Sequence, residues 1–88
     1  MELIYPREAT RIYVPMNLDG TLSRAVFEVA HVEEQMQLYW HIDETFIGST
    51  QQFHSMEFNP TPGPHLLTVV DERGERLEQR FEIIAKEE

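Results

Sequence analysis

Four histidines are the first candidates for metal binding or acid–base chemistry in this sequence, because imidazole binds metals and exchanges protons near neutral pH. They are His31, His41, His54 and His65, and their spacings match neither an HxxxH nor an HExxH metal motif. His41 and Asp43 are two positions apart, so on a strand both side chains would share one face and could supply half of a metal site. Because a site needs three or four converging ligands, we expect a surface cross-strand hydrogen bond there instead.

Catalytic chemistry has no other signature in this chain. Ser23, Ser49 and Ser55 lack the strand–turn–helix context of a hydrolase nucleophile. His54 and His65 stand in register with apolar residues, so we expect them at the core margin with hydrogen-bond partners. The chain has no cysteine, which excludes disulfides, thiolate catalysis and cysteine-ligated metals. We therefore expect no catalytic residue, no metal site and no cofactor.

Exposed aromatic side chains suggest binding instead of catalysis. Tyr39 is expected on the outer face of a strand, and Tyr13 and Phe46 on sheet edges. A flat aromatic strip beside His41 and Asp43 would suit sugar rings or a partner strand. Single aromatics on a sheet face are also ordinary packing partners. The candidate partner-binding residues are Tyr39, His41, Asp43 and Tyr13.

Two strand-like runs must position these side chains. The first run, 38–43, holds the only tryptophan, Trp40, and alternates apolar and polar residues. The second run, 65–71, follows a Pro-Gly-Pro turn that can be neither helix nor central strand. Its alternation points Leu67 and Val69 inward, so we expect these two side chains to face Trp40 inside a core.

Turn residues interrupt the rest of the chain at short intervals, and the apolar period is two rather than 3.6. Further strands are expected at about 3–5, 11–14, 23–31, 46–48, 53–58 and 77–84. The pattern predicts an all-β fold, an immunoglobulin-like antiparallel β-sandwich of about seven strands with no disulfide.

Length and charge narrow the classes of function. Eighty-eight residues indicate a single domain, 1–88. The net charge of −9 repels phosphate backbones and anionic lipid, so nucleic-acid binding is not expected. No apolar run approaches the length that spans a bilayer. The start, Met1-Glu2, lacks the basic region of a signal peptide, so we expect a piece of a larger protein whose upstream part directs any export.

The order of these blocks resembles a known family. The tryptophan strand, followed about twenty residues later by the Pro-Gly turn and the His-x-Leu-x-Val-x-Asp strand, is similar to the C-terminal domain of bifunctional penicillin-binding proteins of the 1C type. Two positions depart from the pattern, because Glu44 and Ala9 stand where glycine is common. The matching residues are 4–8, 11–15, 18–20, 26–27, 38–43, 61–71 and Gly74.

The resemblance implies a parent enzyme anchored in the inner membrane, with glycosyltransferase and transpeptidase domains that build peptidoglycan. This domain would be a non-catalytic accessory module on the periplasmic side, which either docks to other parts of the parent or to envelope proteins or acts as a spacer. A peptidoglycan-binding module is the alternative. A small metal-dependent enzyme is a third hypothesis, and it predicts zinc binding through His41.

Overall fold

A computed structural model describes residues 1–7 and 10–86, and these residues form eight strands and no helix. The predicted turn at Ala9 lies outside the described residues. No segment of the described chain is therefore a helix that could cross a membrane. The strands are β1 (Glu2–Tyr5), β2 (Arg11–Pro15), β3 (Ala25–Ala30), β4 (Leu38–Ile42), β5 (Thr45–Thr50), β6 (Ser55–Phe58), β7 (Gly63–Asp71) and β8 (Arg76–Lys86).

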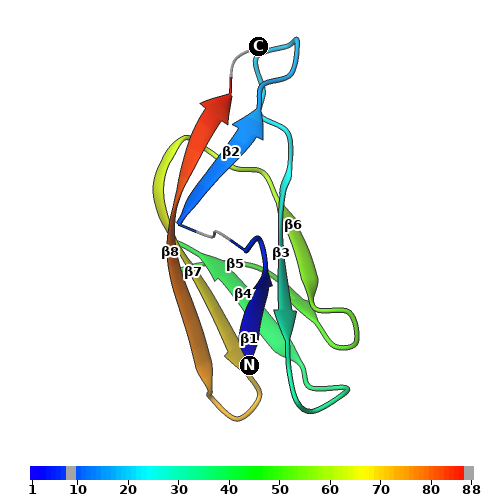
Figure 1. The fold of residues 1–88 in the computed structure, drawn as a ribbon. Helices are drawn as coiled ribbons and strands as arrows, with labels where there is room; N and C mark the ends of the chain where they lie inside the picture. The colour runs from blue at the N-terminus through cyan, green and yellow to red at the C-terminus, as the bar shows by residue number, and fades with distance from the viewer. Residues whose placement is uncertain (8–9, 87–88) are drawn as a thin grey trace.

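The strands form two sheets packed face to face, as the alternation predicts (Figure 1). One sheet has the order β1-β3-β6, and the other has the order β2-β8-β7-β4-β5. The first segment of the chain is divided between the sheets: β1 pairs with β3, and β2 then crosses to pair with β8. This β2–β8 pair is parallel, which departs from the fully antiparallel prediction. Parallel neighbours need a long connection, and here nearly the whole chain lies between them.

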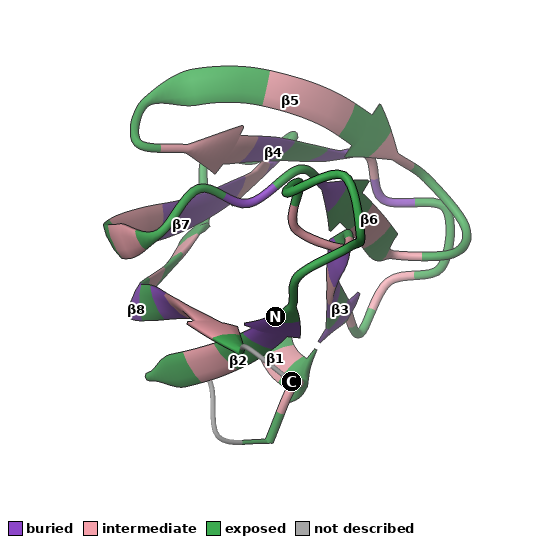
Figure 2. Ribbon diagram, turned by 90° about the horizontal axis from the view of Figure 1, so that it is seen from above, coloured by how far each residue is buried: buried purple, intermediate pink, exposed green. Residues whose placement is uncertain are grey.

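The core lies between the sheets and centres on the tryptophan strand. Trp40 and Leu38 are completely buried, and so are Leu67 and Val69 on the neighbouring strand. The register pairs Trp40 directly with Val69, so the two predicted runs are adjacent as expected. Figure 2 shows the buried positions on the inner faces of both sheets. Burial of this single apolar layer is the main stabilising contribution in a domain of this size.

Three phenylalanines close the core across the sheets. Phe27 on β3 stacks on Phe58 of β6 with ring centroids 5.4 Å apart. Phe81 of β8 meets Phe27 edge-on at 5.1 Å. These geometries are the ones that aromatic pairs prefer, so they fix the spacing of the two sheets as well as filling it.

The β4–β5 hairpin places an edge strand beside Trp40. Trp40 pairs with Gly48, and a β-bulge follows between Trp40 and His41. A Cβ added to Gly48 would lie 2.9 Å from the Cε of Met56, so glycine allows this strand to approach the other sheet closely. In the strand order β5 is the last strand, so it lies at one edge of the five-stranded sheet (Figure 2).

Candidate functional site

Part of the predicted binding surface is present on the outer face of β4 and β5. Tyr39 is 38% exposed and Phe46 is 57% exposed. The ring of His41 meets Phe46 edge-on, with centroids 5.6 Å apart. These three side chains form a continuous patch that we call the β4–β5 aromatic face. Within the described chain, His41 Nδ1 is a buried polar side-chain atom without a hydrogen-bond partner.

Asp43 does not share this face, so the expectation that it lies beside His41 on the outer face is wrong. Asp43 and Glu44 form the two-residue turn between β4 and β5, with φ angles of 50° and 69°. Positive φ at both positions is the geometry of tight hairpin turns. The turn carries Asp43 to the start of β7, where Oδ1 accepts from the Leu66 backbone N–H at 2.8 Å and Oδ2 accepts from His65 Nδ1.

His65 is held from both sides at the margin of the core. Its Nδ1 donates to Asp43, and its Nε2 donates to the carbonyl of Thr61 at 2.7 Å. Burial opposes a positive charge on this ring, but these hydrogen bonds and the Asp43 charge raise the pKa of His65. The hydrogen bond from His65 lowers the pKa of Asp43 despite some burial. The pair therefore ties the β4–β5 turn to β7 as an ion pair.

Tyr13 lies far from the β4–β5 aromatic face. It pairs with Ile84 of β8, whereas Tyr39 pairs with Val70, whose partner on β8 is Arg76. Arg76 and Ile84 are separated along β8 by roughly 27 Å at the usual strand rise. Tyr13 is well exposed, but the structure does not join it to Tyr39 in one aromatic strip.

A histidine–carboxylate cluster that the sequence did not predict joins the two sheets. His31 Nε2 lies 3.0 Å from Asp71 Oδ2, and His31 Nδ1 accepts from the Glu33 backbone N–H at 3.0 Å. Because Nδ1 accepts this hydrogen bond from Glu33, the proton of the neutral His31 ring is on Nε2. Asp71 Oδ1 accepts from the backbone N–H groups of Arg73 and Glu75, each at 2.9 Å. The hydrogen bond from His31 is the main cause that lowers the pKa of Asp71, and burial opposes it.

The same cluster includes the one group of potential metal ligands that converges within the described residues. One ligand atom from each of His31, Asp71 and Glu75 lies within 4.8 Å of the others. Both nitrogens of His31 and both oxygens of Asp71 already have hydrogen-bond partners. The arrangement is that of a structural clasp between the β7–β8 turn and the end of β3, and His41 is not part of it.

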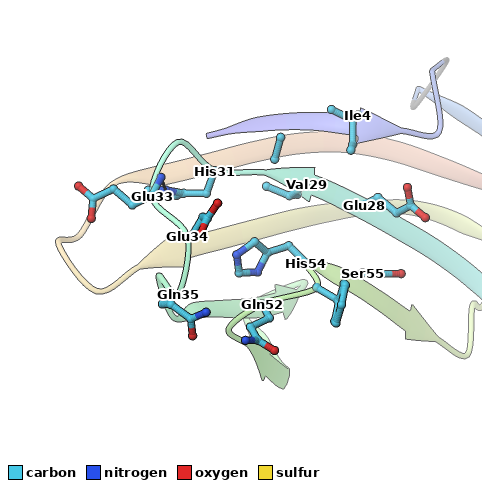
Figure 3. A pocket seen from close by; sticks show the side chains of 12 residues that line it. Ile4, Glu28, Val29, His31, Glu33, Glu34, Gln35, Gln52, His54 and Ser55 are labelled. Atoms are coloured by element: carbon cyan, nitrogen blue, oxygen red, sulfur yellow. Dashed lines mark hydrogen bonds between the residues drawn. The ribbon is translucent and has the colours of Figure 1, made fainter.

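Beside this clasp is a cleft of about 680 Å³, bounded by the β3–β4 and β5–β6 loops and by residues of β1, β3 and β6. Figure 3 shows His54 in the middle of the cleft, with Glu34 and Gln52 from the two loops around it. Ile4 of β1 and Phe53 of the β5–β6 loop add apolar surface, and both are well exposed. We call this feature the His54 cleft.

A hydrogen-bond relay fixes His54 within the cleft. Trp40 Nε1 donates to Thr50 Oγ1 at 2.9 Å, and Thr50 Oγ1 forms a second hydrogen bond with His54 Nδ1 at 2.8 Å. Burial lowers the pKa of His54, and the nearby His31 lowers it further. The neutral form of the His54 ring is therefore favoured, and Thr50 holds the ring at Nδ1.

Comparison with known proteins decides the family. The Penicillin-Binding Protein C-terminus Family matches residues 1–81. The chain belongs to this family. The match supports a C-terminal domain of a bifunctional penicillin-binding protein. No curated protein sequence matches the chain.

A solved structure supports the fold of this penicillin-binding protein C-terminal domain. The structure of Clostridium thermocellum CbhA fibronectin(III)-like modules matches with a TM-score of 0.66 and 14% identity. The match covers 98% of this chain and 95% of that chain. At this identity it shows the fold alone, a small all-β sandwich.

The residues that sequence reasoning missed are those brought together from distant segments. His31 and Asp71 are 40 positions apart, and the His54 cleft combines residues of three strands with two loops. A period-two pattern assigns residues to faces but gives no pairing between the ends of different strands. The proline-bounded strand 65–71 with its terminal aspartate was the available signal, because an aspartate opening an Asp-x-x-Gly turn often caps that turn.

Proposed function

We propose that this domain is a non-catalytic accessory module of a bifunctional peptidoglycan synthase of the 1C type. In this proposal it works on the periplasmic side of an inner-membrane-anchored parent and docks onto another domain of that parent. Its family membership supports the context. The hydrogen bonds of His31, His54 and His65 support a structural role for these histidines instead of a catalytic one.

The observation that carries the docking proposal is the composition of β5. Free sheet edges are normally protected from pairing by charged residues or proline. Within the described chain, each other edge strand has such a residue: Glu2 on β1, Arg11 and Pro15 on β2, and Glu57 on β6. β5 (Thr45–Thr50) has six residues and neither a charge nor a proline.

The neighbouring surface suits an added strand. Phe46 and Tyr39 are exposed on the outer face next to this edge, and Ser49, which pairs with Tyr39, is small and exposed. Strand addition gains affinity from main-chain hydrogen bonds and specificity from side chains beside the edge. The net charge of −9 has no contribution from β5 itself, so an approaching strand meets no charged side chain along residues 45–50. We therefore assign the partner segment to an extended strand of a neighbouring domain of the synthase.

Limited proteolysis of the full-length synthase tests this proposal. A docked domain shields the linker that precedes it from the protease. Phe46→Asp puts a charge beside the β5 edge and should weaken docking, so the linker should be cleaved faster. Tyr13→Asp is the matched control, since it changes an equally exposed aromatic away from β5. Equal cleavage rates for the wild type and both variants would overturn docking through β5. Unfolding of the isolated chain checks that neither variant alters the fold itself.

A further inference from the structure

We propose that the His54 cleft binds a peptide segment that carries a side-chain amine. This site lies on the β1–β3 side of the molecule and is separate from the β4–β5 aromatic face. Its volume of about 680 Å³ falls within the range of roughly 300–1,000 Å³ that is usual for ligand pockets. The proposal therefore adds a second binding site to the docking function.

The charges that line the cleft select against anions. Glu28, Glu33 and Glu34 all line it, and no lysine or arginine is among its described lining residues. Arg73 binds Glu33 from outside at 2.6 Å, whereas Glu28 and Glu34 are exposed. His54 adds no opposing positive charge, because burial lowers its pKa. Phosphate or carboxylate ligands would be repelled, and an ammonium group would be attracted.

The uncharged groups select for a peptide. His54 Nε2 has no hydrogen-bond partner among the described residues, and the hydrogen bond between Nδ1 and Thr50 holds the ring in place. A peptide backbone can satisfy Nε2 in either tautomer, because it offers both a carbonyl acceptor and an N–H donor. The side chains of Gln35 and Gln52 line the same cleft and offer both donors and acceptors to a backbone (Figure 3).

The apolar surface of the cleft can contact the methylene stem of a side chain that ends in an amine. Ile4 is 49% exposed and Phe53 is 85% exposed, although both are large apolar residues. The methylene stem of a long amine side chain buries well against such surfaces while its charged end stays near water. A single ligand of this kind would contact the glutamates, the His54 ring and the apolar surface of the cleft.

Amide chemical shifts of the isotopically labelled 88-residue chain test this proposal. The probe is the acetylated and amidated tripeptide Ala-Lys-Ala, titrated at low salt. We expect shifts at the amides of 33–35 and 52–55, and at the His54 ring. The same peptide with an acetylated lysine side chain should bind at least about fivefold more weakly, because the charge is lost.

Matched variants separate the site from general electrostatics. Glu34→Gln should weaken binding about two- to fivefold, as expected for one exposed ion pair. Glu78→Gln, which changes an exposed acid on β8, should leave binding unchanged. The proposal is overturned by the absence of shifts, by equal binding of the acetylated peptide, or by shifts confined to β5.

The same titration distinguishes the source of the amine. A purified cell-wall stem peptide with a free side-chain amine is compared with the tripeptide. Tighter binding of the stem peptide would assign the cleft to cell-wall peptides, and equal or weaker binding would assign it to protein segments. Linker cleavage in the Phe46→Asp synthase does not depend on either result. Peptide binding at the His54 cleft and docking through β5 can therefore be refuted independently.

Discussion

His31 Nε2 lies 3.0 Å from Asp71 Oδ2, although the two residues are 40 positions apart and belong to different halves of the sandwich. His31 follows β3 in the three-stranded sheet, and Asp71 ends β7 in the five-stranded sheet. Both side chains are almost completely buried. The contact therefore holds the two sheets together at the end of the molecule where the His54 cleft opens.

Replacing Asp71 with Asn should lower the melting temperature by more than about 5 °C. The carboxylate accepts hydrogen bonds from His31 and from two backbone N–H groups, and the amide cannot satisfy all of them. Circular dichroism measures the transition. Arg24→Gln is the control, because its ion pair with Glu57 is exposed and contributes little. If His31→Asn and Asp71→Asn have fully additive effects, the clasp between them is not the source of stability.

Thr50→Val should destabilise the domain by about 1–3 kcal/mol. Valine keeps the shape of threonine but leaves the buried Trp40 N–H without its acceptor. Urea unfolding, followed by tryptophan fluorescence, measures the free energy of unfolding. The ring nitrogen shifts of His54 give a second readout, since loss of the Thr50 hydroxyl removes the hydrogen-bond partner of Nδ1 and should change the tautomer population. An unchanged tautomer population would contradict the relay.

His54 and His65 should tilt the pH dependence of stability in opposite directions. The pKa of His65 is raised, so its stabilisation is complete below the unfolded value near 6.5 and is lost as the pH rises through the folded pKa. The pKa of His54 is lowered, so its contribution is present above 6.5 and is lost as the pH falls through the folded pKa.

Melting temperatures of His54→Gln and His65→Gln between pH 4 and pH 8 measure this effect. His65→Gln should lose most stability at the acidic end, and His54→Gln should remove part of the acid destabilisation. Asp43 acts below this pH range, because its lowered pKa gives stability that is lost only as the pH falls below the unfolded value of about 3.8 and through the folded pKa. Parallel profiles for the wild type and both variants would show that the two rings do not titrate as their contacts require.

Glu44→Gly should raise the free energy of unfolding by about 1 kcal/mol. Glu44 has a φ of 69°, a left-handed conformation that glycine adopts without steric cost. Thermal unfolding measures the change. Glu78→Gly in the middle of β8 is the control and should destabilise the domain, because glycine weakens a strand interior. A destabilised Glu44→Gly variant would mean that the glutamate side chain contributes more than the turn geometry.

The sequence predicts the sandwich because alternation assigns faces reliably. Trp40, Leu67 and Val69 face inward as expected, and β5 is an edge strand. Asp43 was misplaced because alternation was continued past the end of β4. The Asp43-Glu44 turn lacks the glycine that would have marked it.

Two further features of the structure were not predicted from the sequence, for a different reason. The parallel pairing of β2 with β8 and the His31–Asp71 clasp are long-range contacts. Which strand a short segment such as β2 joins depends on packing across the whole sandwich, and local propensity carries little of that information.

Hydrogen exchange at β5 is the most direct test of whether another domain of the synthase adds a strand to this edge. The amides of residues 45–50 are compared between the isolated 88-residue chain and the full-length synthase. If another domain adds a strand to this edge, the amides that point away from β4 should exchange at least about tenfold more slowly in the synthase. The amides of the exposed β2 edge serve as the internal control. Equal exchange of β5 in both proteins, or slowing at β2 instead, would contradict docking through β5.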